Sequence, residues 1–404
     1  MITPSGVNWL FLDLNSYFAS VEQQLNPKLR GRPTAVIPVN ADTTCCIAAS
    51  YEAKRCGVCT GMRVYEAKAL CPAIQLVIAH ENRYVAYHHR IRDAVESCVP
   101  IHAVLSIDEM ICRLTGTQRQ IPQAMALARH IKGTIAEKVG SELKSSIGLA
   151  PNPYLAKVAG EMQKPDGLTV LTKGDLPGIL FRLSLRDLPG IGEQTEQRLR
   201  RRGIHSVKAL CALDTGEMRE IWGGVVGERF WSWLRGEETP ETPGHRHSIG
   251  HSHVLEPQAR SIPAVYRIAK QLTSKAAVRL RQEKFWTTGL SLRVRFGGDD
   301  EWEARAKFVE AQDTSTMLKA LAELWNRIPN QKPFWISVTF HPLIPERLHN
   351  PSLFQNGQDR LSIVMDEING RYGRNTAYFA SLHDAIDQGP NRIAFRHIPE
   401  LSEF

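Results

Sequence analysis

The sequence lacks any long apolar run. A helix that spans a bilayer needs about 20 consecutive apolar residues, and no stretch of the 404 residues approaches that length. Residues 1–7 also lack the basic segment and the apolar segment of a secretion signal. We therefore expect a cytoplasmic protein that has no membrane as a partner.

Paired cysteines and repeated segments are also scarce. Among eight cysteines, Cys56 and Cys59 form a CxxC pair close to Cys45 and Cys46, but no second pair stands at the spacing of a zinc ribbon. Buried free thiols are the preferred interpretation. No repeat or low-complexity tract occurs, and 43% apolar with 23% charged residues excludes a disordered or collagen-like chain. The length predicts two to four globular domains.

Acidic residues are outnumbered by basic ones. Fifty Lys and Arg face 42 Asp and Glu, which gives a net charge of +8. Between His245 and Phe340 there are fifteen basic and nine acidic residues, so six of the eight excess charges fall in that quarter of the chain. Such an excess favours an anionic partner. It indicates a polyanion-binding module in this region.

Three carboxylates stand at the ends of predicted strands. Trp9–Leu12 is an apolar run too short for a helix and typical of a strand buried on both faces, and Asp13 follows it. Ala103–Ile107 and Met110–Leu114 predict a strand pair with Asp108-Glu109 at its connection. If these strands are neighbours in one sheet, the three carboxylates converge.

Converging carboxylates repel one another unless cations neutralise them. Oxygen ligands suit Mg²⁺, and two such ions about 4 Å apart can activate an attacking hydroxyl and stabilise a leaving pyrophosphate. The competing interpretation is that Asp13 caps a helix, while Asp108 and Glu109 only decorate a turn. That helix is itself expected to be capped by Asn15 or Ser16.

Further residues are candidates for holding phosphates. Tyr51, Lys54, Arg55 and Lys164 offer compact charges or a hydroxyl donor, although lone basic residues are usually only solvated. The glycine-containing turn Leu188–Gly192, between predicted helices, lets the backbone approach a phosphate. As a helix-hairpin-helix it would hold a DNA strand without reading bases, and the alternative is an ordinary tight turn.

The second half of the chain follows a linker at Gly236–His247, which is rich in Glu, Thr, Pro and Gly. The pattern beyond it predicts the order β-α-β-β-α-β, a split ferredoxin-like unit. The expected elements are strand Ile249–Leu255, helix Ile262–Gln282, strands Thr287–Phe296 and Trp302–Val309, helix Thr314–Arg327 and strand Trp335–His341.

Several of these segments closely resemble the motifs of Y-family translesion DNA polymerases. The segments, which occur in the family's order, are Phe11–Glu22, Ala49–Lys54, Ser106–Glu109, Asn152–Gly167, Leu188–Gly192 and His247–Gly250. The similarity covers about Gly6–Pro342. It implies an α+β multidomain right-hand polymerase. The expected domains are the palm (1–15 and 82–172), the fingers (16–81), the helical thumb with its helix-hairpin-helix (173–238), a linker (239–247), the ferredoxin-like little finger (248–342) and a tail (343–404).

The resemblance also implies catalytic roles. Asp13 and Asp108 would bridge two Mg²⁺ ions, Glu109 would bind the ion near the primer hydroxyl, and the Leu14 carbonyl would complete the shell of the other ion. Phe18 would be the steric gate, a ring under the incoming sugar that clashes with a 2′-hydroxyl.

Binding roles are implied for other residues. Tyr51, Lys54 and Lys164 would hold the triphosphate of the dNTP. For Phe18 the competing candidate is Tyr17, which on a helix would point about 100° away, toward the face of Val21. Primer–template DNA would be contacted through its phosphates by residues of the thumb and little finger: Gly190, Gly192, Arg279, Arg293 and Arg295.

The tail contributes a further expectation. Asn350–Phe354 resembles the short peptide that binds a sliding clamp, with Leu353 and Phe354 as its apolar residues. The alternative is a local hydrophobic contact. A sliding clamp and accessory mutagenesis proteins are therefore expected as partners.

Three residues depart from the family's pattern. Lys54 stands where Arg is usual, Ala48 replaces a common Thr and Pro153 a common Lys, so nucleotide affinity is expected to be weak, whereas no metal ligand is lost. Other residues lean partly toward the polymerase IV group and partly toward the polymerase V catalytic subunit. The sequence predicts a low-fidelity polymerase that copies damaged templates. The alternatives are a non-catalytic DNA-bound scaffold that recruits another polymerase, and a repair nuclease.

Overall fold

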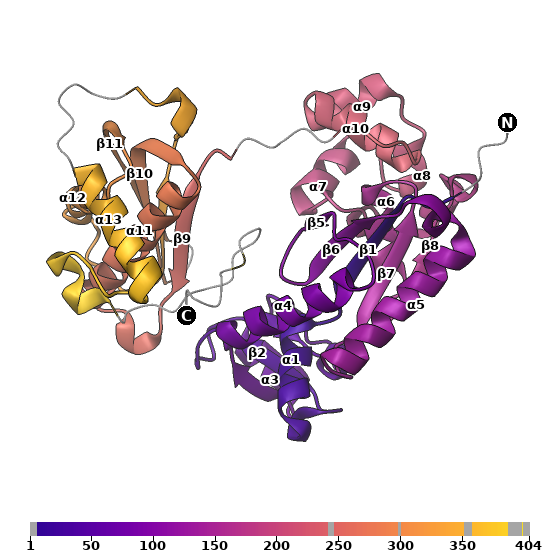
Figure 1. Cartoon of the computed structure of the whole chain (residues 1–404), viewed down its shortest axis with the longest axis horizontal. Helices are drawn as coiled ribbons and strands as arrows, with labels where there is room; N and C mark the ends of the chain where they lie inside the picture. The colour runs from indigo at the N-terminus through magenta and orange to yellow at the C-terminus, as the bar shows by residue number, and fades with distance from the viewer. Residues whose placement is uncertain (1–5, 241–245, 298–299, 351–357, 387–397, 399–404) are drawn as a thin grey trace. The chain divides into compact units, whose positions relative to one another are not determined.

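The structure is a computed structural model that describes residues 6–240, 246–297, 300–350, 358–386 and 398 (Figure 1). The chain divides into two compact units, one mainly of residues 1–242 and the other mainly of residues 243–392. In the described part of the chain, no helix is both long and apolar enough to cross a membrane.

The first unit is built on a five-stranded sheet in the order β5-β6-β1-β7-β8. The strands are β1 (Trp9–Leu14), β5 (Ala103–Val104), β6 (Glu109–Arg113), β7 (Ser145–Ala150) and β8 (Leu168–Val170). The central strand β1 runs antiparallel to both β6 and β7 and is buried along its whole length. The predicted strand at 9–12 is confirmed, and it extends through Asp13, so Asp13 lies within the buried sheet.

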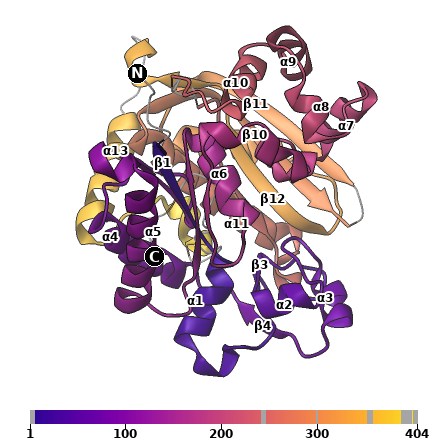
Figure 2. The same cartoon turned by 90° about the vertical axis from the view of Figure 1, so that its right-hand side faces the viewer.

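Helices cover both faces of this sheet. Leu10 and Leu12 face a core shared with α4 (Glu81–Glu96) and α5 (Ile121–Lys138), whereas Phe11 faces α6 (Pro153–Met162). Helix α6 lies against β1 and β7 (Figure 2). A Cβ atom added to Gly148 would stand 2.0 Å from the Ala156 carbonyl oxygen, so this close packing requires glycine.

The segment expected to form the fingers contains a small sheet in the order β3-β2-β4, with β2 (Thr34–Ile37), β3 (Ala48–Ala49) and β4 (Gln75–Ile78). Its helices are α1 (Tyr17–Leu25), α2 (Tyr51–Arg55) and α3 (Val64–Leu70). The Ser50 side chain caps α2 by accepting a hydrogen bond from the Ala53 backbone N–H. The predicted side-chain cap of α1 is wrong: Ser16, at the N-cap, is left-handed (φ 49°) and makes no capping bond.

The thumb segment consists of α7 (Glu193–Arg201), α8 (Val207–Cys211), α9 (Thr215–Trp222) and α10 (Val225–Leu234). Between β8 and the Leu188–Gly192 turn the described chain forms 3-10 turns at Lys173–Asp175, Gly178–Arg182 and Leu185–Asp187. The α-helix expected on that side of the hairpin is therefore replaced by 3-10 turns.

The second unit contains β9 (Ile249–Val254), α11 (Ile262–Gln282), β10 (Phe285–Phe296), β11 (Glu301–Ala311), α12 (Thr314–Trp325) and β12 (Pro333–Phe340). The predicted element order β-α-β-β-α-β is confirmed. The sheet order is β11-β10-β12-β9, so each helical connection skips one strand, as in a split β-α-β unit. The second and fourth strands are central, whereas a ferredoxin-like sheet has its first and third strands there. The expected ferredoxin-like strand order is therefore wrong.

Helices α11 and α12 of the second unit pack on one face of its sheet. Leu290, Leu292 and Val294 of β10 point into this core. Side chains alternate along a strand, so Arg293 and Arg295 point to the opposite, open face. The face that carries Arg293 and Arg295 is therefore opposite the face on which α11 and α12 pack.

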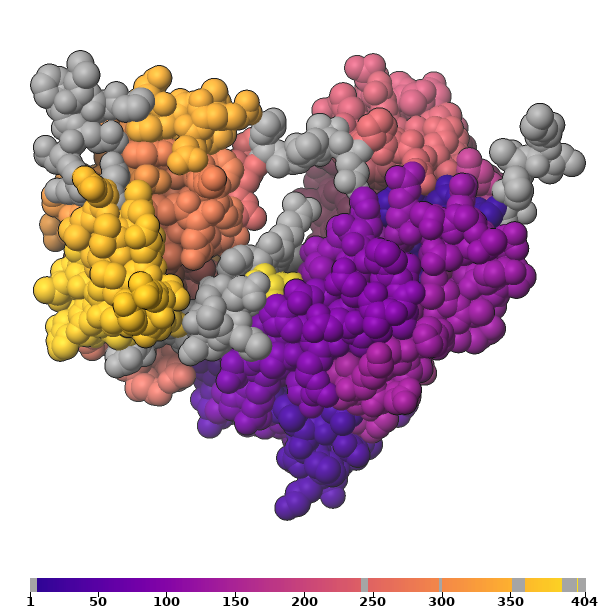
Figure 3. Space-filling view, viewed as in Figure 1, coloured from indigo at the N-terminus to yellow at the C-terminus, as the bar shows by residue number. Residues whose placement is uncertain are grey.

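Part of the segment predicted as a tail is packed on the second unit. Strand β13 (Leu343–Pro345) pairs with β10, and α13 (Gln358–Tyr372) and a 3-10 turn (Ala380–Ala385) follow. The Arg281 side chain is 6% exposed and donates to both Asp366 carboxylate oxygens, at 2.6 and 2.9 Å. Helix α13, in yellow, lies on the surface of this unit (Figure 3). The clamp-binding residues Leu353 and Phe354 lie outside the described residues.

Candidate active site

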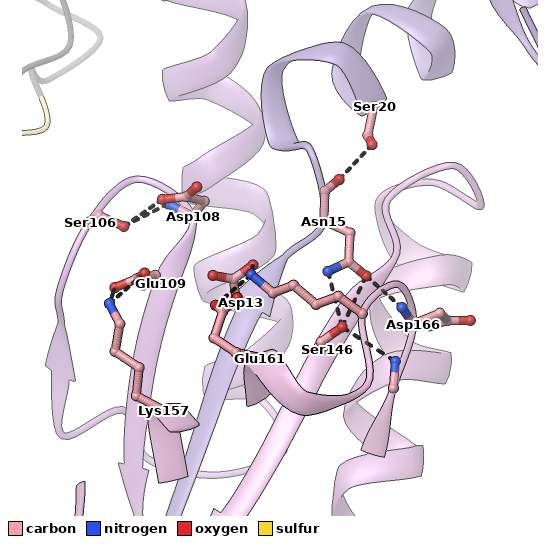
Figure 4. A network of polar contacts seen from close by, with 12 residues as sticks. Asp13, Asn15, Ser20, Ser106, Asp108, Glu109, Ser146, Lys157, Glu161 and Asp166 are labelled. Atoms are coloured by element: carbon pink, nitrogen blue, oxygen red, sulfur yellow. Dashed lines mark hydrogen bonds and ion pairs between the residues drawn. The ribbon is translucent and has the colours of Figure 1, made fainter. Parts of the chain in front are cut away.

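The three predicted carboxylates come from the facing ends of β1 and β6. Asp13 lies opposite Glu109 in the strand register, and the Leu14 backbone N–H donates to the Asp108 carbonyl oxygen at 2.9 Å. Asp13 is 6% exposed, and Asp108 and Glu109 are partly exposed. The predicted adjacency of β1 and the 108–109 connection is thus confirmed (Figure 4).

Lysines neutralise two of these carboxylates. Lys164 Nζ lies 2.8 Å from Asp13 Oδ1 and 2.6 Å from Glu161 Oε1, and Lys157 Nζ lies 2.7 Å from both Glu109 oxygens. Burial raises the pKa of Asp13 to about 7, against the lowering effect of Lys164, and the charges of Asp108 and Glu161 raise it further. The attraction of Lys164 therefore does not offset the cost of burying the Asp13 charge.

The donor chemistry of this site fits Mg²⁺, because all three side chains offer carboxylate oxygens and Asp13 stands in excess negative charge. Among the described residues, however, no three His, Cys, Asp or Glu side chains are grouped closely enough to hold a metal as they stand. The Glu109 carboxylate is held by Lys157 (Figure 4). Lys157 therefore donates to both oxygens of the Glu109 carboxylate.

The turn that carries Lys164 is held by two side chains, Asn15 and Ser146, that the sequence does not predict to contact it. The Asp166 backbone N–H donates to Asn15 Oδ1 at 2.7 Å, and the Gly167 N–H donates to Ser146 Oγ at 3.3 Å. Asn15 also donates to Ser146 Oγ at 3.0 Å. These bonds connect Asn15 to the turn that carries Lys164. The pairing is long-range, so the local sequence pattern does not predict it.

The loop before Asp108 is held from two sides. Ser106 Oγ donates to Asp108 Oδ1, and the ring of His88, on α4, is hydrogen-bonded through Nδ1 to the Ile107 carbonyl oxygen at 2.7 Å. His88 is 2% exposed, and burial lowers its pKa, so the neutral ring is favoured. The Asp108 connection is therefore held both by Ser106 and by His88 of α4.

Tyr51 and Lys54 lie together on α2. Lys54 Nζ stands over the Tyr51 ring, 4.4 Å from its centroid. Burial and the charge of Lys164 lower the pKa of Lys54, and Asp13 raises it. Lys54, Lys164 and Asp13 are thus close enough to interact, so the predicted triphosphate-binding residues converge near the carboxylates.

The two aromatic residues at the start of α1 differ in their surroundings. Tyr17 is 3% exposed and donates its hydroxyl to the Tyr84 carbonyl oxygen at 2.6 Å. Phe18 is partly exposed and stacks on the Tyr84 ring at 4.4 Å, and the Tyr84 hydroxyl donates to buried Glu22 at 2.9 Å. Tyr17 is therefore a core residue. Phe18 packs on the Tyr84 ring, which the hydrogen bond to Glu22 holds in place.

The departures from the family's pattern are structurally compatible. Ala48 lies in β3 and is 7% exposed. Pro153 is the first residue of α6, where its fixed φ is favourable, and the Asn152 side chain caps that helix by accepting from the Leu155 N–H at 2.8 Å.

The predicted DNA-binding residues fall in separate places. Gly190 is left-handed (φ +89°) and Gly192 is the N-cap of α7. Arg293 and Arg295 lie on the open face of the second unit, where both donate to Glu301, Arg295 at 2.8 Å. Arg279 is not brought together with them: it lies on α11, against the other face of the sheet, and pairs with Glu283 at 2.8 Å.

Family models match most of the chain. The impB/mucB/samB family matches residues 12–161, the thumb domain of DNA polymerase-iota matches residues 186–238, and the C-terminal domain of the impB/mucB/samB family matches residues 246–353.

Similar proteins span nearly all of it. DNA polymerase IV of Moorella thermoacetica is 33% identical over 390 residues, which are 93% of this chain and 96% of that protein. DNA polymerase IV of Pelotomaculum thermopropionicum is 30% identical over 381 residues, 91% of this chain and 93% of that protein. A solved Y-family DNA polymerase chimera built on Dbh has a TM-score of 0.69 at 25% identity and covers 83% of this chain and 99% of that one. The chain therefore belongs to the Y-family of translesion DNA polymerases.

Proposed function

We propose that this DNA polymerase inserts dNTPs opposite damaged template bases by two-metal-ion nucleotidyl transfer at Asp13, Asp108 and Glu109. The observation that carries the proposal is the register that sets Asp13 opposite Glu109, with Asp108 bonded beside Leu14. The comparisons lend no support to the alternative of a non-catalytic scaffold.

The carboxylates would hold two Mg²⁺ ions together with the Leu14 carbonyl. When bound, such ions lower the pKa of an attacking hydroxyl and stabilise the leaving pyrophosphate. Asp13 would supply a buried carboxylate ligand. Lys157, 2.7 Å from Glu109, holds that carboxylate when no cation is bound, and Lys164 does the same for Asp13.

Nucleotide binding is assigned to the two lysines and the tyrosine that converge on this site. Lys54, Lys164 and the Tyr51 hydroxyl would contact the triphosphate. Lys54 offers one point charge where a guanidinium would make two bonds, so we expect weak nucleotide binding. Phe18 would lie under the sugar as the steric gate, because it is partly exposed and held by Tyr84.

DNA would be held through its phosphates. The open sheet face with Arg293 and Arg295 would contact the duplex, together with the Gly190–Gly192 turn, whose backbone can approach a phosphate. Arg279 is the least suited of the predicted contacts, because its side chain is 11% exposed and paired. The palm, fingers, thumb, little finger and linker boundaries given above belong to this proposal, as do a sliding clamp at Leu353 and Phe354, accessory mutagenesis proteins and a cytoplasmic location.

Primer extension by the purified full chain tests the function. The chain is mixed with a labelled primer on a template carrying one abasic site, with dNTPs and with or without Mg²⁺. We expect Mg²⁺-dependent extension past the lesion. DNA binding without extension would indicate a scaffold, and template cleavage would indicate a nuclease.

A further inference from the structure

The fingers hold most of the cysteines of the chain. Five of the eight lie within residues 45–71, and the polymerase reaction proposed above uses none of them. They are Cys45, Cys46, Cys56, Cys59 and Cys71. Among the residues that the structure describes, no group of three or more is arranged to hold a metal ion, which argues against zinc.

Two of these thiols are in contact. Burial and the neighbouring Cys56 thiol raise the pKa of Cys71, so the two side chains lie within interaction distance. Cys56 is the C-cap of α2 and Cys71 is the C-cap of α3, so the contact joins the ends of two helices. A second observation places these ends side by side: a Cβ atom at Gly57 would lie 3.8 Å from the Leu70 side chain.

The two thiols differ in exposure. Cys56 is exposed, whereas Cys71 is 3% exposed. A solvent-accessible thiol with a second thiol beside it is the usual arrangement of an oxidisable pair, because the first meets the oxidant and the second resolves the product. Cys45, Cys46 and Cys59 are near one another, and Cys46 is the buried member of that group.

We propose that Cys56 and Cys71 are a modification site that a peroxide converts into an intramolecular disulfide. The Cys56 sulfur attacks hydrogen peroxide and becomes a sulfenic acid, with release of one water. The Cys71 sulfur then attacks the Cys56 sulfur, and the hydroxyl leaves with the Cys71 proton as a second water. Two thiols are oxidised and one peroxide is reduced to two waters, and a dithiol reductant reverses the change.

The disulfide would act on the helix that carries Tyr51 and Lys54. Helix α2 has only five residues, so a covalent bond at its C-cap constrains the whole helix relative to α3. We expect the KM for dNTP to shift when the pair is oxidised. This consequence rests on the proposed function, whereas formation of the bond does not.

The bond is tested on the full chain by peroxide treatment, alkylation of remaining thiols, digestion and mass spectrometry. We expect a cross-linked peptide that joins Cys56 to Cys71, lighter than the two reduced peptides by two hydrogen atoms, and loss of two of the eight titratable thiols. Dithiothreitol should restore both. The exposed Cys56→Ser variant should form no cross-link, and Cys59→Ser, a matched exposed control three residues away, should form it as the parent does.

Two outcomes would overturn the proposal. One is a cross-link that pairs Cys56 with Cys45, Cys46 or Cys59, and the other is retention of all eight thiols under conditions that oxidise a free dithiol peptide. The KM for dNTP is then compared between oxidised and reduced chains. An unchanged KM in a fully cross-linked chain would refute the effect on α2, and absence of extension by the reduced chain would count against the proposed function instead.

Discussion

Carboxylates paired with cations occur in two regions of this molecule, and their depth differs. In the palm, Asp13 is 6% exposed beside Lys164, and burial raises its pKa to about 7 despite that lysine. On the open sheet of the second unit, hydrogen bonds from Arg295 and Arg293 lower the pKa of Glu301, since burial opposes them only weakly. A cation partner therefore fails to offset the burial of the carboxylate in one place, whereas in the other it stabilises the charged carboxylate.

This difference indicates how each region exchanges partners. Desolvation makes a buried carboxylate costly unless more positive charge arrives, so the palm is suited to taking up cations. Exposed pairs contribute little to stability and exchange readily, so the arginines of the sheet can leave Glu301 for a phosphate. Substitutions in both regions test this contrast.

The largest effect is expected for Asp108→Asn. The amide keeps the size of the side chain and removes the charge, so transition-state stabilisation should fall by about 3 kcal/mol or more, a loss of at least roughly a hundredfold in kcat/KM. Single-nucleotide insertion measures this loss, and DNA affinity should not change. The matched control is Glu303→Gln on the exposed sheet. If the kcat/KM of Asp108→Asn lies within tenfold of the parent value, the expected difference between the two regions is wrong.

The second largest effect is expected on discrimination between deoxyribonucleotides and ribonucleotides. Phe18→Ala removes the ring under the sugar, and overpacking by a 2′-oxygen costs about 1–3 kcal/mol, so discrimination against ribonucleotides should fall roughly ten- to a hundredfold. The ratio of dNTP to rNTP insertion measures it. Tyr17→Phe, which removes the hydroxyl bonded to the Tyr84 carbonyl, should leave that ratio unchanged. The reverse result would assign the gate to Tyr17.

A smaller effect is expected from buried His88. Burial and the neighbouring charges of His89 and Arg92 lower its pKa below the usual 6.5, while Asp108 and the bond to Ile107 oppose this. As pH falls, the unfolded chain therefore takes up the proton before the folded chain does. The stabilisation is present above pH 6.5 and is lost as pH falls toward the folded pKa, by less than about 1.4 kcal/mol per pH unit.

Denaturant unfolding of the parent and of His88→Asn between neutral and mildly acidic pH measures this loss. The difference between the two stability curves should shrink below pH 6.5. An unchanged difference would show that His88 titrates alike in both states.

The smallest effect is expected for Glu301→Gln. The substitution releases Arg293 and Arg295 from their carboxylate, so DNA should bind more tightly by less than about tenfold, and the salt slope should steepen by about 0.9 for each phosphate gained. Fluorescence anisotropy at several salt concentrations gives both values. Weaker binding would mean that Glu301 orients the arginines for DNA.

The convergence of the three carboxylates could be predicted because its signal is local. An apolar strand that ends in Asp13 and a hairpin that carries Asp108 and Glu109 need only one assumption, the adjacency of two strands. The partners Lys157 and Lys164 were harder to place, because their contacts depend on how α6 and its turn pack against β1. Lys157 was noted only as part of a motif, and no periodicity points it at Glu109.

The strand order of the second unit illustrates another limit. Hydrophobic alternation predicts strands and their inward faces, as at Leu290 and Leu292, but the same pattern suits either order of an interleaved sheet. Likewise, Asp366 lies 85 residues from Arg281 in sequence, so no local pattern predicts their hydrogen bond. Long-range pairing is the physical information that the linear pattern lacks.

The bond between Arg281 and Asp366 bears on modularity. The C-terminal family model ends at residue 353, which makes that point an attractive boundary for exchanging this module between relatives. A graft cut there would take Arg281 and leave Asp366 behind, and a guanidinium only 6% exposed would lose the carboxylate that it contacts through two nitrogens. A module for exchange must therefore extend at least through α13. Its boundary is determined by the buried Arg281–Asp366 pair, and the end of the family match lies too early in the chain.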